Sequence, residues 1–351
     1  MKNRWIIAAA SLAVAAVTVV GYRWWAKPEP NAQIEMLGQL PPNPNAVVYV
    51  DLAALRQSPF LAALLKWAPQ SQIDADYARF VQSTGFDYER DLRRIGLGLY
   101  NSGPETTLFA VAEGRFDKRK LTAYALQAGT RVTQGGREIF SVPVSGARQI
   151  SFRFLRNDRI ALTNGYMGSS ESVQPSLNSE AQDWRERFLR LAGSPIFAVV
   201  RESAASSGVL SEQAPRALAS PELSALLNQL QWITIAGKPD AQNLRVVLEG
   251  EGSPQTNTLQ MSDVLNGLLV FAEAGLHDPK TRAQLQPQTR EAYLEVLKSA
   301  DVSRIDRGET KSVRLVFDIT PNFLEAFRPP GPGEAAPLLQ QPSPKKGSIR
   351  N

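Results

Sequence analysis

The segment PNAVVYVDLAALRQSPFLAALLKW (residues 44–67) decides the fold of this 351-residue chain. Its first part, Ala46–Asp51, is rich in β-branched residues and follows Pro and Asn, so it predicts a strand. Over residues 52–67 the leucines recur at helical spacing, and Pro59 must break that helix or start a second one. Asp51 closes the strand and should cap the following helix. A strand that leads at once into helices indicates a mixed α and β fold.

The rest of the first half continues this mixture. A helix over residues 73–83 should end at Gly85, the residue type that best adopts a left-handed cap. Gly135-Gly136 is typical of a hairpin turn. Periodicity and turn residues predict strands over 95–100, 107–113, 138–142, 149–155 and 159–163, and a helix over 117–128.

The second half repeats this order less clearly. It predicts strands over 196–201, 232–236, 244–249, 302–306 and 312–319, and helices over 221–230, 257–276 and 288–300. An apolar stripe on the long helix should face the core; it consists of Leu265, Leu268, Leu269 and Ala272. The turns between adjacent strands are too short for parallel crossovers. We therefore predict an α+β fold of two similar repeats of mainly antiparallel sheet with packed helices, residues 45–178 and 179–328.

Two stretches carry a resemblance to known sequences, VVYVDLAALRQSPFLAALL (47–65) and TGFDYERDL (84–92). Together with the layout of an apolar N-terminal segment and a duplicated body, they resemble uncharacterised bacterial membrane-anchored or exported proteins, known only as domains of unknown function. In layout the resemblance covers about residues 45–320. It implies a location and a fold, but no reaction and no catalytic residue.

An apolar segment of eighteen residues runs without a charge from Trp5 to Tyr22 and is long enough to span a bilayer. Tyr22, Trp24 and Trp25, with the basic residues around them, suit a membrane–water interface better than a peptidase site. We predict a transmembrane helix within residues 1–26. The alternative is a cleaved signal peptide, which would release an exported soluble protein.

Basic residues on the short N-terminal side favour a cytoplasmic N-terminus. The body would then lie on the extracytoplasmic side of a bacterial inner membrane. Residues 27–44 hold five prolines and predict an extended stalk. Residues 329–351 show no apolar periodicity and predict a disordered tail.

The net charge of +5 does not point to nucleic acid. Residues 1–28 have a charge of +4 and residues 329–351 of +2, which leaves −1 for residues 29–328. A nearly neutral body lacks the excess positive charge that phosphate binding requires. The basic run within residues 115–120 is interpreted as a solvated helix face, with a local basic patch as the alternative.

The inventory of side chains excludes several kinds of catalysis. The chain has no cysteine and one histidine, so Cys–His chemistry and most zinc sites are ruled out. His277 follows the long helix and is interpreted as a C-terminal cap. Gly96-x-Gly98 lies in a strand and lacks the third glycine of a dinucleotide fingerprint. We predict no cofactor and no resident metal.

Carboxylates are the remaining route to chemistry. Asp74 and Asp76 lie at a helix start, and Asp87 and Asp91 lie in the turn beyond it. They are the candidates for a metal site or a glycosidase-like acid pair. Their spacing fits no calcium loop and arginines lie among them, so capping and surface ion pairs are the preferred interpretation.

Three functions remain open. The preferred one is a non-enzymatic binding or interaction module of the bacterial envelope, with an envelope protein as partner. The second is a carboxylate- or metal-dependent hydrolase, which requires at least two of these four carboxylates to converge in one pocket. The third is a carrier of an apolar ligand in a cavity lined by the leucine-rich helices, although such leucines more often form an ordinary core.

Overall fold

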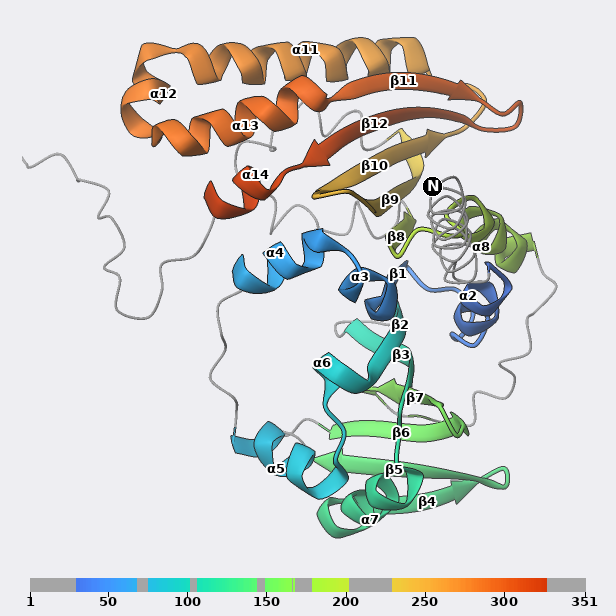
Figure 1. Cartoon of the computed structure of the whole chain (residues 1–351). Helices are drawn as coiled ribbons and strands as arrows, with labels where there is room; N and C mark the ends of the chain where they lie inside the picture. Colours follow the sequence, from blue (N-terminus) through green and yellow to red (C-terminus); the bar gives the residue numbers. More distant parts are fainter. Residues whose placement is uncertain are drawn as a thin grey trace, which may run out of the picture.

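The computed structural model describes residues 30–67, 75–101, 106–143, 149–165, 167, 179–201 and 229–326. Within them, 12 strands form one sheet in which neighbouring strands are antiparallel (Figure 1). The strands are β1 (Ala46–Asp51), β2 (Leu92–Asn101), β3 (Thr106–Gly114), β4 (Thr130–Gln134), β5 (Arg137–Pro143), β6 (Gln149–Arg156), β7 (Arg159–Thr163), β8 (Ile196–Arg201), β9 (Leu230–Asp240), β10 (Asn243–Gly252), β11 (Asp301–Asp306) and β12 (Lys311–Ile319).

Strands β1 and β8 form a seam in the middle of the sheet, with Val48 opposite Ala198. From this seam the first half continues outward as β2-β3-β7-β6-β5-β4, and the second half continues the other way as β9-β10-β12-β11. The predicted α+β class and the antiparallel pairing are confirmed. The two halves share one sheet because the first strand of each half covers an edge of the other. An internal duplication stays a prediction.

Helices cover both faces of the sheet. They are α2 (Pro30–Leu37), α3 (Leu52–Arg56), α4 (Pro59–Trp67), α5 (Ala75–Thr84), α6 (Tyr88–Asp91), α7 (Lys118–Ala128), α8 (Ser179–Arg190), α11 (Thr258–His277), α12 (Pro279–Gln284), α13 (Pro287–Ser299) and α14 (Pro321–Ala326). On β8 the side chains alternate between the two layers. Val199 packs with α2 and α8 on one face, and Val200 packs with α11 on the other.

Most local signals in the sequence are confirmed. Pro59 begins α4, and Gly85 follows α5 with φ +71°. Gly135 and Gly136 have φ +56° and +73° and turn the chain between β4 and β5. The helix expected over 221–230 falls mostly outside the described residues, and Leu230, its last residue, belongs to β9.

The extended stalk predicted for residues 27–44 is wrong where the structure describes it. Residues 30–37 form α2, whose Met36 and Leu37 are buried in the central core. Gly96 of β2 makes room for this helix, since a Cβ there would lie 2.9 Å from Leu37 Cδ2. The prolines of this stretch favoured an extended chain. A short helix of low intrinsic stability forms here instead, because tertiary contacts stabilise it.

Among the described residues, no helix is both long and apolar enough to cross a bilayer. The predicted anchor (1–26) and the predicted tail (329–351) lie outside the part of the chain that the structure describes.

Candidate functional site

The acidic candidates divide into two groups. Asp74 lies outside the described residues, as does the side chain of Asp76. Asp87 caps α6 by accepting from the N–H of Glu89 at 3.0 Å, and the Tyr77 hydroxyl also donates to it at 3.2 Å. Asp87 therefore has the capping role that the spacing favoured.

Asp91 is buried at the end of α6 beneath two exposed arginines. Arg90 Nη2 lies 2.7 Å from Asp91 Oδ2, Arg115 Nη2 lies 2.9 Å from Asp91 Oδ1, and the backbone N–H of Asp87 donates to the same carboxylate at 3.0 Å. The hydrogen bond from Arg90 leads in lowering the pKa of Asp91 to about 2. Such a carboxylate stays ionised and has its lone pairs occupied, so it fastens a turn and is ill suited to be a general acid.

A row of charged side chains crosses the sheet near Asp91. Asp51, Arg94, Glu113, Arg159 and Arg156 stand opposite one another on β1, β2, β3, β7 and β6. Arg94 lies 3.0 Å from Asp51 and 3.3 Å from Glu113, and Arg159 lies 2.9 Å from Glu113. Asp51 also caps α3, as the sequence predicted, by accepting from Ala54 N–H. We call these five residues the charge row.

Glu35 links α2 to the charge row. Its Oε1 accepts from Arg156 at 2.9 Å and from Arg159 at 3.1 Å. The hydrogen bond from Arg156 contributes most to lowering the pKa of Glu35, while partial burial opposes it. The charge row thus holds the first described helix against the sheet. Sequence reasoning missed this link because Glu35 lies 121 and 124 positions from Arg156 and Arg159.

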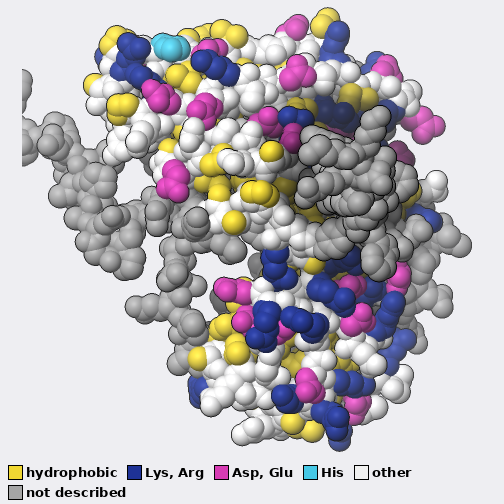
Figure 2. Space-filling view, viewed as in Figure 1, with side chains coloured by type: hydrophobic (Ala, Val, Ile, Leu, Met, Phe, Trp, Pro, Cys, Tyr) yellow, Lys and Arg dark blue, Asp and Glu magenta, His cyan; other side chains and the backbone are white. Residues whose placement is uncertain are grey.

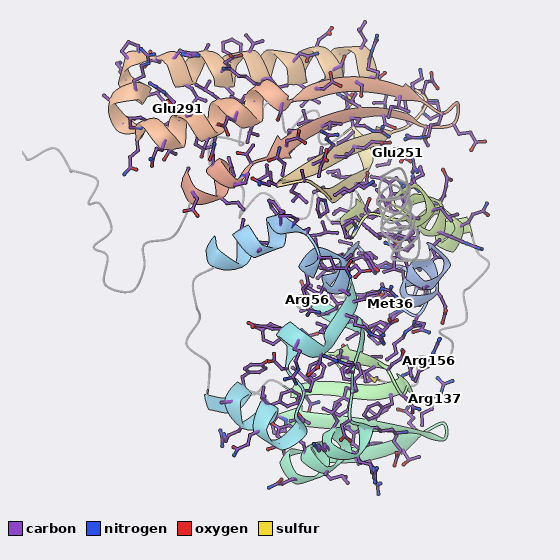
Figure 3. The ribbon with its side chains drawn as sticks, in the orientation of Figure 1. Met36, Arg56, Arg137, Arg156, Glu251 and Glu291 are labelled. Carbon is purple, nitrogen blue, oxygen red and sulfur yellow. The ribbon has the colours of Figure 1, made fainter. Side chains whose placement is uncertain are left out.

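The second half carries a charge cluster of its own at the end of β10. Arg187 of α8 pairs with the buried Glu251 and stacks over Trp232, with its guanidinium carbon 3.9 Å from the ring centroid. Arg190 adds a contact of 2.7 Å to the same glutamate. Glu249 lies two positions before Glu251 on β10. Burial would raise the pKa of Glu249, but hydrogen bonds from Arg307 and Arg314 hold that pKa below its ordinary value. Figure 3 shows Glu251 between α8 and the sheet.

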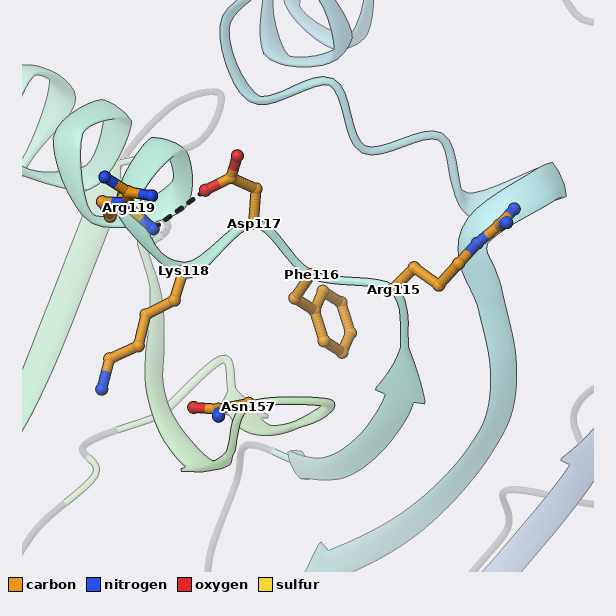
Figure 4. Close-up of a pocket in the computed structure, with 6 residues that line it drawn as sticks. All are labelled: Arg115, Phe116, Asp117, Lys118, Arg119 and Asn157. Atoms are coloured by element: carbon orange, nitrogen blue, oxygen red, sulfur yellow. Dashed lines mark hydrogen bonds between the residues drawn. The ribbon is translucent and has the colours of Figure 1, made fainter.

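An open hollow of about 510 Å³ lies at the start of α7 (Figure 4). Its lining consists of Arg115, Phe116, Asp117, Lys118, Arg119 and Asn157. Asp117 accepts from the N–H groups of Arg119 and Lys120, each at 3.1 Å, so the helix N-terminus already holds an anion. The basic side chains are exposed, in keeping with a solvated helix face.

Helix α11 exposes apolar side chains that the fold leaves uncovered. Leu265 packs in the cluster around Met261, but Val270 and Phe271 are 67% and 78% exposed, and Ala272 is exposed as well. The predicted apolar stripe therefore faces the core only in part. Figure 2 shows hydrophobic side chains along this upper edge beside the histidine. That residue, His277, is the last residue of α11, and Asp278 takes the C-cap position that the sequence assigned to His277.

There is also free space beside the backbone in the middle of α11, at Gly267. A Cβ added at Gly267 would meet nothing within 4 Å, so no contact in the described structure accounts for glycine there. Glycine inside a helix costs about 0.5–1 kcal/mol relative to alanine. The 20 residues of α11 include Asp263 and Glu273 but no lysine or arginine. The exposed surface of α11 around Gly267, Val270 and Phe271 is named the α11 face.

Comparison with known proteins assigns no family to this chain. No family model and no curated protein matches the chain. Among solved structures, crystal form III of TP0453 is similar at 9% identity with a TM-score of 0.42, over 82% of this chain and 95% of the other. Crystal form IV of TP0453 gives 9% identity and 0.41, over 84% and 96%. This is a weak structural resemblance, and no residue role follows from it.

Proposed function

We propose that the chain is a non-enzymatic binding module of the bacterial envelope, anchored in the inner membrane through residues 5–22, with its body on the extracytoplasmic side. The observation that carries the binding role is the exposure of Val270 and Phe271 on a long helix. Contiguous apolar surface of this kind is typical of interaction sites.

The partner proposed for the α11 face is a protein with an apolar helix or strand face bordered by neutral or basic side chains. The absence of lysine and arginine from α11, together with Asp263 and Glu273, favours such a rim. Gly267 would let the partner's backbone approach closely. Full burial of a side chain such as Phe271 or Val270 contributes about 1.5–3 kcal/mol, which is the size of an interface hot spot.

Site-specific crosslinking tests the partner. A photoreactive amino acid at position 271 in the membrane-bound chain should give one defined adduct. The same group at Leu189 of α8, an apolar residue that is 52% exposed, should not give it. With the identified protein purified, Phe271→Gln should weaken binding about tenfold or more, and Leu189→Gln should leave it unchanged. Equal adducts or equal affinities at the two positions would count against the α11 face.

Fractionation tests the anchor. The full-length protein should remain with the inner membrane, and its mass should include residues 1–22. A soluble chain that starts near Arg23 would instead identify the segment as a cleaved signal peptide. Protease added outside the cytoplasmic membrane should digest the body if the proposed orientation is correct.

The proposal includes an internal duplication. It is supported by the strand order, since β1-β2-β3-β7-β6 and β8-β9-β10-β12-β11 follow the same path outward from the seam. It is also supported by Glu113-Gly114 and Glu251-Gly252, which end the corresponding strands β3 and β10. Alignment of the first half against the second across many related sequences tests it, and similarity no better than chance would oppose it.

A further inference from the structure

Arg153 occupies an unusual place on β6. It stands opposite Ala161 of β7 and directly follows Phe152, which pairs with Phe140 of β5. Because side chains alternate along a strand, Arg153 points to the face that carries α2 and α8, away from Phe152. On that face it adjoins the buried apolar cluster of Ile139, Ala161 and Met167.

Arg153 is buried, and among the described residues it has no carboxylate partner. The residue is 7% exposed and its Nε makes no hydrogen bond. In the part of the chain that the structure describes, no carboxylate forms an ion pair with it. The other two buried arginines of this face, Arg159 and Arg187, each hold a buried glutamate. An unpaired buried charge costs several kcal/mol, so arginine is an expensive choice here unless an anion completes the site.

A second arginine adds to the positive charge. Arg137 of β5 lies two positions before Ile139 and therefore faces the same side. Burial lowers the pKa of Arg153, and repulsion from Arg137 lowers it further. Figure 3 places Arg137 at the same edge of the sheet as Arg156, whose charge is already balanced by Glu35.

Hydroxyl groups lie on the other side of Arg153. Ser151 is two positions before it on the same face, and its Oγ lies 2.9 Å from Ser141 Oγ on β5. Hydroxyls can donate to an oxyanion, and a guanidinium binds a carboxylate or phosphate with two parallel hydrogen bonds. The neighbourhood therefore combines two cations and two hydroxyls with an apolar border.

We propose that Arg153 and Arg137 form a binding site for an oxyanion, a carboxylate or a phosphate group, on the α2–α8 face of β5 and β6. The site is separate from the α11 face, and it does not depend on the proposed partner.

Thermal unfolding of the full chain in detergent tests the site, with inorganic phosphate or acetate added at constant ionic strength. Phosphate, acetate or both should raise the Tm saturably by a few degrees, and the more effective anion identifies the ligand chemistry. Arg153→Met should abolish the shift and Arg137→Gln should reduce it. Arg131→Gln is the matched control, because Arg131 is exposed on the neighbouring strand β4 and pairs with Glu138 of β5 at 3.1 Å. No shift in the wild type, or the same shift in Arg153→Met, would overturn the proposal.

The stability of the variants without added anion gives an independent readout. Arg153→Met should then leave the Tm unchanged or raise it, because it removes an uncompensated buried charge. If Arg153→Met lowered the Tm and the wild type did not respond to anions, the arginine would be satisfied within the chain and the proposal would be wrong.

Discussion

In both halves of the sheet an ion pair holds a helix against the strands, but the charges on helix and strand are reversed. In the first half, the strands supply arginines and α2 supplies the acid, since Glu35 reaches Arg159 and Arg156. In the second half, α8 supplies Arg187 and Arg190, and β10 supplies Glu251. Both helices precede the seam strand of their half. Each seam helix is therefore fastened by ion pairs to a buried charged side chain of the sheet, Arg159 in the first half and Glu251 in the second, and the sign of that charge differs between the halves.

The halves differ in the number of carboxylates that pair with each buried arginine. Arg159 contacts two acids, Glu113 and Glu35. Arg187 has Glu251 as its carboxylate partner among the described residues. Removing one acid should therefore lower the free energy of unfolding more in the second half than in the first.

The largest expected effect follows from breaking that single pair. Glu251→Gln leaves Arg187 buried without a carboxylate, which should lower the free energy of unfolding by about 3–5 kcal/mol. Urea denaturation followed by tryptophan fluorescence measures it, since Trp232 lies under this arginine. The double variant Arg187→Met with Glu251→Leu should recover much of the loss. A loss below about 1 kcal/mol would show that the pair contributes little.

The matching change in the first half should cost less. Glu113→Gln leaves Arg159 with Glu35 and Arg94 with Asp51, so we expect a loss of about 1–3 kcal/mol in the same urea experiment. Adding Glu35→Gln should bring the cost close to that of Glu251→Gln. If Glu113→Gln alone equalled Glu251→Gln, the difference drawn between the halves would fail.

The fit of α2 against the first half can be tested by size. Gly96→Val places methyl groups against Leu37, which is buried and has little room to move, and should cost about 1–2 kcal/mol. Leu37→Ala in the Gly96→Val background should cost less than Leu37→Ala alone, because the valine fills part of the space. Additive losses in this double-mutant cycle would mean that the two residues do not interact.

Asp91 adds a pH-dependent contribution in the first half. Its pKa of about 2 lies below the usual 3.8, so its stabilisation is complete at neutral pH and is lost as pH falls from about 4 to about 2. Because Arg90 and Arg115 are exposed and screened by solvent, Asp91→Asn should cost only about 1 kcal/mol. The difference in urea midpoint between Asp91→Asn and wild type should shrink toward pH 2, and a constant difference would contradict the role of its charge.

The smallest expected effect is a gain in stability rather than a loss. Gly267→Ala meets nothing in the described structure, so it should stabilise the isolated protein by up to about 1 kcal/mol through helix propensity. The same variant should weaken binding of the proposed partner, because the added methyl group blocks close approach to α11. Measuring both quantities separates the two effects, and unchanged binding would remove Gly267 from the interface.

Much of the local structure could be read from single residues and short periods. β1, the break before Pro59 and the cap at Asp51 were all predicted because each depends on neighbours within a few positions. The missed elements were α2, α6, α8, α12, α14 and β4, most of which are short or lie in stretches rich in polar residues or proline. These elements exist through the surfaces on which they pack, and composition carries little trace of such surfaces.

By itself, the sequence determined the α+β class, the antiparallel pairing and the positions of the main turns and caps, because these follow from backbone sterics and periodicity. Tertiary structure alone decided that β1 joins β8, that Glu35 meets Arg156 across 121 positions, and that Arg153 is buried with no carboxylate partner among the described residues. It also decided that Phe271 is exposed rather than packed in the core. Contacts between distant residues depend on how whole layers stack, and no short window of sequence contains that information.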